Sequence, residues 1–166
     1  MASSPDNYAL LRAELRFKKE GTGTYVDLGN APEIELTLAV DKLEHFSSRT
    51  GTKTKDKVIV RQKSGTIRMV LEEITASNLA LWALDENYSG SGAVNIFASN
   101  SIEGSVLVTG TNEVGNQFEW ELVSVSLNPS TSINLISGDD LARIEITGDV
   151  LAVNGTFGTI TPILPT

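Results

Sequence analysis

Few side chains in this sequence have the type and spacing that catalysis requires. The 166 residues include one histidine, His45, and no cysteine. A hydrolytic triad needs a histidine base beside its nucleophile, and thiolate chemistry needs cysteine. His45 lies inside a polar stretch, where a lone histidine is usually a surface residue. We therefore predict no catalytic residues and a protein that is not an enzyme.

The acidic pairs and glycine turns also lack the patterns of metal, cofactor or phosphate sites. Asp139-Asp140 is a pair without the series of oxygen ligands that a calcium loop supplies. Glu72 and Glu73 are neighbours in a predicted strand, so their side chains should point to opposite faces. The turns at 21–23 and 90–92 lack the Gly-Lys-Ser/Thr ending of a phosphate-binding loop. We therefore expect no metal and no cofactor.

Charge is distributed unevenly along the chain. The formal net charge is −8, but residues 1–68 hold twelve of the 13 basic and nine of the 21 acidic residues, a net of +3. Residues 69–166 hold only Arg143 against twelve acids, a net of −11. Eight basic residues fall between Lys42 and Arg68. They could form a solvated basic loop, or one end of a molecule that attracts its own copies head to tail.

Nucleic-acid binding through this basic stretch is not favoured. Phe46 is the only aromatic residue among the basic ones, whereas single-strand binding grooves normally provide aromatic stacking platforms. The acidic total argues in the same direction, because phosphates repel carboxylates. We therefore expect no specific nucleic-acid binding through this stretch.

Alternation of apolar and polar residues predicts a mostly β chain. One helix should begin after Thr75 as its N-cap and extend to about Glu86. Asn154-Gly155 predicts a tight hairpin turn. After Leu122 the apolar positions change phase, which indicates a bulge or a strand that bends from one sheet into another. Strands are expected at 8–18, 24–28, 33–41, 58–62, 66–74, 93–98, 104–110, 116–127, 141–147, 150–153 and 156–160.

These elements predict one domain over residues 1–166. The expected fold is two packed β-sheets, a sandwich or barrel-like arrangement, with one flanking helix. Residues 41–57 are polar and are expected to form a long extended loop, and loops above roughly 12 residues are usually functional or disordered. No run approaches the roughly 18 apolar residues of a membrane span, so no membrane contact is expected.

Three pieces between Tyr25 and Leu84 stand out by their order and spacing. They are Val26-Asp27-Leu28-Gly29-Asn30 leading into 33–36, Lys42-Leu43-Glu44-His45-Phe46-Ser47-Ser48 followed by 54–56, and 66–71 followed by Glu73-Ile74-Thr75 and Asn78-Leu79-Ala80. Through these pieces, which cover a minority of the chain, the segment resembles the tail tube (major tail) proteins of long-tailed non-contractile phages, a siphovirus-type family related to type VI secretion tube proteins.

The resemblance implies a self-assembling structural virion protein. Hexameric rings would stack head to tail into a tail tube that conducts genomic DNA. The tube would surround the tape-measure protein during assembly and meet the tail terminator and distal tail proteins. The protein would belong to the virion tail, assembled in the host cytoplasm.

The resemblance also implies two groups of site residues. The long loop should reach the next ring, and an acidic lumen should repel DNA phosphates. The inter-ring group is Asp41, Lys42, His45, Arg49, Lys53, Lys55, Asp56 and Lys57. The lumen group is Glu33, Glu35, Glu119 and Glu121, each on the polar face of a predicted strand.

Two other functions fit the sequence. One is the tube protein of a phage-tail-like bacteriocin or type VI secretion system. The other is a carbohydrate-binding β-sandwich module, which would present aromatic residues on exposed loops. Half of the ten aromatic residues instead fall in apolar patterns, which argues against the second function: Phe17, Trp82, Phe97, Phe118 and Trp120.

Overall fold

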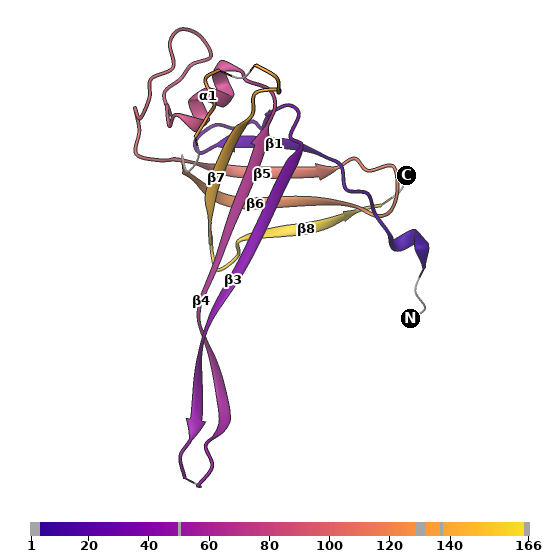
Figure 1. The fold of residues 1–166 in the computed structure, drawn as a ribbon, viewed down its shortest axis with the longest axis vertical. Helices are drawn as coiled ribbons and strands as arrows, with labels where there is room; N and C mark the ends of the chain where they lie inside the picture. The colour runs from indigo at the N-terminus through magenta and orange to yellow at the C-terminus, as the bar shows by residue number, and fades with distance from the viewer. Residues whose placement is uncertain (1–3, 50, 129–131, 137, 165–166) are drawn as a thin grey trace.

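The computed structural model describes residues 4–49, 51–128, 132–136 and 138–164 (Figure 1). Its described part is mostly β, with eight strands in one antiparallel sheet that is not closed into a barrel. The prediction of a mostly β fold with one flanking helix is confirmed. The elements are the short 3-10 helix η1 (Pro5–Asn7), α1 (Ala76–Trp82), β1 (Ala13–Lys19), β2 (Val26–Asp27), β3 (Glu33–Ser47), β4 (Thr54–Leu71), β5 (Ile102–Gly110), β6 (Gln117–Asn128), β7 (Ile144–Leu151) and β8 (Gly158–Ile163).

β6 divides the sheet into two layers. β5 pairs along one edge of β6, while the other edge is shared, with residues 117–122 pairing with β8 and 124–128 pairing with β7. We call β2-β1-β5-β6-β8 the β8 layer and β7-β4-β3 the β4 layer. Figure 1 shows that the strands of the two layers cross. The two packed sheets that were expected are thus the two layers of one continuous sheet.

A bulge in β6 makes this division possible. Gly104 pairs with Val125 and Val106 pairs with Leu122, so β6 has one more residue than β5 in this interval. The extra residue lets Leu122 and Val125 both face the core, although they are three residues apart. The bulge that was predicted from the phase change is confirmed.

The core lies between the two layers. Leu15 of β1 and Val106 of β5 are fully buried from one side, and Ile67 and Met69 of β4 are buried from the other. Burial of apolar area at about 25 cal/mol per Å² is what holds the layers together. Leu79 and Trp82 of α1 and Phe157 also pack against this core.

The helix α1 is shorter than predicted. Its N-cap is Thr75, as expected, and the Thr75 side chain accepts a hydrogen bond from the backbone N–H of Asn78. The helix ends at Trp82 instead of about Glu86, because Leu84 has a φ of 57° that right-handed helix does not allow. No helix in the described part of the chain is both long and apolar enough to cross a membrane.

Most of residues 41–57 lie in strands instead of a long loop, with 41–47 in β3 and 54–57 in β4. β3 and β4 pair continuously from Glu33 opposite Val70 to Ser47 opposite Thr54, with register shifts after Asp41 and after His45. β4 therefore also passes without a break through 63–65, between the two strands that were expected at 58–62 and 66–74. Because β7 pairs only with residues 65–71 of β4, the outer part of the hairpin projects from the body (Figure 1). We call residues 38–47 and 54–64 the ribbon.

Three other strand predictions are wrong. The separate strands expected at 141–147 and 150–153 are one strand, β7. Residues 93–98 form part of a connection, with Phe97 N–H donating to the Ala83 carbonyl at 2.7 Å, and the Phe97 side chain is 67% exposed. Residues 8–12 precede β1 instead of belonging to it. The Asn154-Gly155 turn is confirmed, because Val153 and Thr156 form a bridge and both turn residues have positive φ.

Candidate assembly interface

The ribbon and its tip contain all eight residues that were predicted to contact the next ring. Asp41, Lys42 and His45 lie on β3, and Lys55, Asp56 and Lys57 lie on β4. Arg49 and Lys53 lie in the connection between the two strands. Residues 38–64 carry seven basic and three acidic residues, a net of +4 with His45 neutral. The structure therefore places these residues together on one projecting element.

Most of the positive charge on the ribbon has no partner within the described chain. Lys55 pairs with Glu44 across the strands, and His45 Nδ1 lies 2.6 Å from Asp56 Oδ1. The other six ribbon and tip cations form no ion pair among the described residues: Lys42, Arg49, Lys53, Lys57, Arg61 and Lys63. A net charge that is left unpaired in this way is available to an acidic partner.

The ribbon also exposes a set of large apolar side chains. Leu38 is 69% exposed, and Leu43 lies opposite Ile59 on the outer part of the hairpin. An isolated two-stranded ribbon is only marginally stable in water, and clustered exposed apolar groups mark interaction sites. The set consists of Leu38, Val40, Leu43, Phe46, Val58, Ile59 and Val60. The element thus combines apolar contact area with unpaired cations.

Three strand edges lack partners in the described part of the chain, and the short β2 pairs only with β1. β8 pairs with β6 on one side only, and β3 pairs with β4 on one side only. An open edge presents unpaired N–H and C=O groups to which a strand of another copy can be added. β8 and the short β2 are the two outer strands of the β8 layer.

The four predicted lumen acids lie on opposite sides of the molecule. Ile34 and Leu36 face the core, so Glu33 and Glu35 alternate to the outer face of the β4 layer. Leu122 faces the core, so Glu119 and Glu121 lie on the outer face of the β8 layer. One channel surface can therefore include only one of the two pairs.

The outer face of the β4 layer carries two acids that the sequence analysis did not select. Arg68 bridges Glu33 at 2.9 Å and Glu145 at 2.7 Å, and the hydrogen bonds that its guanidinium donates to Glu145 and Glu33 raise its pKa. Asp149 accepts a hydrogen bond from Asn128 at 2.7 Å. The sequence signal was the alternation of Glu145 and Asp149 with buried residues in one strand.

On the outer face of the β8 layer, the lumen candidate Glu121 forms a hydrogen bond with Tyr25. Tyr25 Oη donates to Glu121 Oε1 at 3.0 Å, and the Lys18 ammonium lies 4.7 Å from the centre of the Tyr25 ring. Burial raises the pKa of Tyr25, and the hydrogen bond to Glu121 raises it further. Glu121 is thus held in place on this face by a neighbour from a distant part of the sequence.

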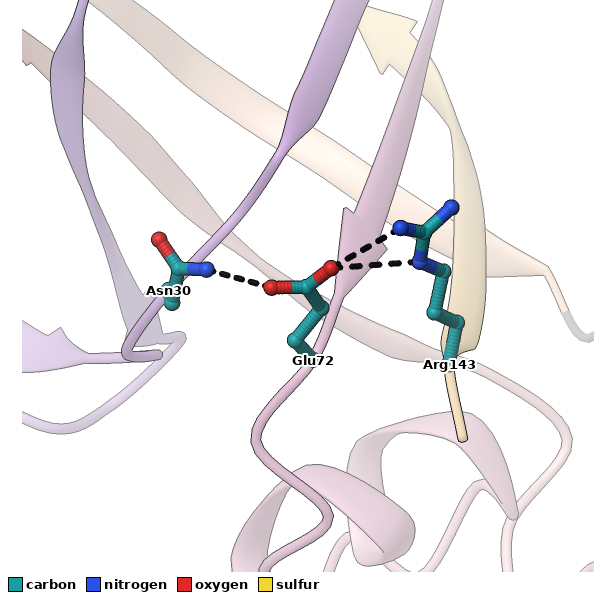
Figure 2. A network of polar contacts seen from close by, with 3 residues as sticks. All are labelled: Asn30, Glu72 and Arg143. Carbon is teal, nitrogen blue, oxygen red and sulfur yellow. Dashed lines mark hydrogen bonds and ion pairs between the residues drawn. The ribbon is translucent and has the colours of Figure 1, made fainter. Parts of the chain in front are cut away.

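At the α1 end of the molecule, hydrogen bonds connect a group of residues that we call the clamp: Asn30, Glu72, Glu73, Asn78 and Arg143. Figure 2 shows Asn30, Glu72 and Arg143. Glu72 accepts from Asn30 Nδ2 at 2.6 Å and from Arg143 Nη2 at 3.0 Å and Nε at 3.2 Å. These contacts connect the segment before β3, the end of β4 and the start of β7. Glu72 and Glu73 were expected within a strand, but β4 ends at Leu71 and both carboxylates take part in this clamp.

The second half of the clamp surrounds Asn78, which is 3% exposed. Asn78 Nδ2 donates to the carbonyls of Leu28 and Glu73, each at 2.9 Å, while Glu73 Oε1 accepts from Asn30 N–H at 3.0 Å. Gly29 has a φ of 81°, and a Cβ there would clash with the Glu73 carboxylate. Residues 28–30 and 73–78, which belong to the first and third segments that resemble tail tube proteins, thus contact each other.

No group of three or more histidine, cysteine, aspartate and glutamate side chains within the described ranges is arranged to hold a metal ion. The features that this part of the chain offers are surfaces for contact, namely the ribbon, the open edges and the charged outer faces.

Comparison with known proteins gives one family match and similar solved structures. Residues 10–85 match a sequence family described as "protein of unknown function UCP028589", a span that contains the ribbon and both halves of the clamp except Arg143. No curated protein matches the chain. One similar solved structure is a chain in the cryo-EM structure of the anti-feeding prophage (AFP) baseplate, which was 6-fold symmetrised. It shares 13% identity, with 89% of this chain and 91% of that chain covered and a TM-score of 0.51, so the two share a fold.

Proposed function

We propose that this protein is a structural, non-enzymatic subunit of a phage-tail-like tube, in which six-membered rings stack head to tail. The observation that carries the proposal is the ribbon, which projects beyond the core with unpaired cations and exposed apolar side chains. A shared fold with a chain from a six-fold symmetrised, phage-tail-like baseplate supports both the tail assignment and the number six.

Ring formation is best explained by the open edges of the β8 layer. β8 lies at one side of this layer, and β2 with the start of β1 lies at the other. If the β8 edge of one copy pairs with the β1–β2 edge of the next, the sheet continues from copy to copy. Such a heterologous contact generates a closed ring when the rotation between copies closes.

This arrangement selects between the two pairs of lumen candidates. The inner face of the β8 layer is covered by the β4 layer, so its outer face would line the channel. Glu119 and Glu121 lie on that face, whereas Glu33 and Glu35 would lie on the outside of the ring. Carboxylates facing the channel would repel DNA phosphates and let the genome pass without specific binding. The tape-measure, tail terminator and distal tail proteins remain the proposed partners in the particle.

The direct test is negative-stain electron microscopy of the purified protein at increasing concentration. We expect rings of six copies that associate into tubes. A protein that stays monomeric up to roughly millimolar concentration, where contacts of about 4 kcal/mol would already be populated, would refute the proposal.

A second function is favoured by the source of the similar structure. A chain of a baseplate suggests a ring at the end of a tail instead of the repeating tube. The same micrographs distinguish the two, because a baseplate ring should form single or paired rings that do not grow with concentration. Whether the particle is a phage, a bacteriocin or a secretion system is tested by looking for packaged DNA in purified particles.

A further inference from the structure

A groove lies between β2 and α1. Figure 1 shows that α1 is at the end of the molecule opposite the ribbon tip. Apolar side chains and carboxylates both line it, including Val26, Leu81, Tyr88, Asp27, Glu73 and Glu86. Its volume is about 450 Å³. Val26 is 57% exposed, so the groove presents apolar surface that this chain does not cover.

The carboxylates of this groove carry uncompensated charge. Neither Asp27, Glu73 nor Glu86 forms an ion pair within the described residues. Asp27 Oδ1 accepts from Gly29 N–H at 2.8 Å, and Glu73 accepts from Asn30 N–H, so backbone contacts hold two of them in place. Lys19 is the one basic residue among the described lining residues, and its ammonium donates to the Glu86 carbonyl.

We propose that this groove receives the ribbon of the next copy in the stack. The inference rests on the proposed head-to-tail stacking and identifies the surface that the ribbon would contact. The ribbon and its tip offer six unpaired cations and apolar side chains such as Phe46 and Val58, which match the acidic rim and apolar lining of the groove. Ribbon and groove lie at opposite ends of the molecule, so each contact leaves one of each free for the next copy.

Cysteine cross-linking tests the contact directly, because the chain has no cysteine of its own. Val26→Cys would be mixed in turn with Val58→Cys and Ile59→Cys, whose side chains point to opposite faces of the ribbon. A disulfide forms only when the two Cα atoms lie within roughly 7 Å, so we expect a dimer on non-reducing gels for one of the two mixtures. Val114→Cys, which is 58% exposed and outside the groove, should give none.

Charge reversal provides the second measurement. Glu86→Lys should raise the critical concentration for stacking about tenfold, because an attraction becomes a repulsion. Glu113→Lys changes the same charge at an exposed position outside the groove and should have little effect. Lys57→Glu in a mixture with Glu86→Lys should restore part of the assembly.

The outcomes separate this inference from the proposed function. If wild-type protein assembles but no Val26 cross-link forms and Glu86→Lys behaves like Glu113→Lys, the groove assignment is wrong and the tube proposal stands. If wild-type protein forms neither rings nor stacks, both are overturned.

Discussion

Replacing Asn78 by alanine should destabilise the fold, because the Asn78 amide connects α1 to the segment before β3. Asn78 Nδ2 donates to the buried carbonyl of Leu28 and to that of Glu73, each at 2.9 Å. In the variant, the Glu73 carbonyl still accepts a hydrogen bond from Thr75 N–H at 3.0 Å. The Leu28 carbonyl has no other hydrogen-bond donor among the described residues. One unsatisfied buried acceptor costs about 1–3 kcal/mol, and one lost hydrogen bond costs about 0.5–1.5 kcal/mol. After allowing up to about 0.7 kcal/mol for the better helix propensity of alanine, the range is about 0.8–4.5 kcal/mol, and we expect a loss near its middle, about 2–3 kcal/mol.

Equilibrium unfolding in urea measures this loss. For a domain of this size, 2–3 kcal/mol corresponds to a fall in the melting temperature of roughly 4–12 °C. Ser77→Ala, at an exposed position of the same helix, is the matched control and should change the free energy of unfolding by less than about 0.5 kcal/mol. Asn78→Asp keeps the size of the side chain, but a carboxylate cannot donate a hydrogen bond. This variant should therefore lower the free energy of unfolding by at least as much as Asn78→Ala. If Asn78→Ala stays within about 0.5 kcal/mol of wild type, the clamp does not stabilise the fold as described.

Three further predictions concern the ribbon and the β8 layer. Replacing residues 42–60 by Asn-Gly should change the free energy of unfolding by less than about 1 kcal/mol, because no described residue there is buried, and should abolish stacking seen by microscopy. Raising the salt from about 0.05 to about 0.5 M should weaken stacking measured by light scattering, and an unchanged critical concentration would mean that apolar contacts dominate. Glu121→Gln should lower the pKa of Tyr25 toward its ordinary value of 10.0 in a spectrophotometric titration. Because the folded protein holds the Tyr25 proton more tightly, stability should be full below about pH 10 and fall above it, and Glu121→Gln should reduce this fall.

Local features of the fold could be predicted from the sequence because they depend on neighbouring residues. Alternation with one buried face predicted the strand that contains Leu15, and the change of phase after Leu122 predicted the bulge in β6. Thr75 as N-cap and Asn154-Gly155 as a turn follow from side-chain and backbone preferences of single residues. Each of these signals lies within a few residues of the feature that it specifies.

The sequence predicted strands at 33–41 and 58–62 but not the outer part of the ribbon, because periodicity indicates a strand only when one face is buried. Both faces of the ribbon are exposed, and the register shifts after Asp41 and His45 change the phase of its apolar residues twice. Residues 93–98 show the opposite error, since they alternate but lack a strand partner. The placement of Glu33 and Glu119 on opposite outer faces depends on strand order, which one sequence does not specify.

The composition of the ribbon indicates an element that is complete only in an assembly. In a free subunit, its cations would keep the open edges and seven exposed apolar side chains from pairing with other copies at random. The same cations would repel each other if two ribbons met, so the favourable partner is an acidic surface. In the stacked arrangement that we propose, burial of the apolar side chains would supply affinity, and the match of charge would select the orientation. The ribbon would then carry the contact between rings, while the neighbouring β8 layers close each ring.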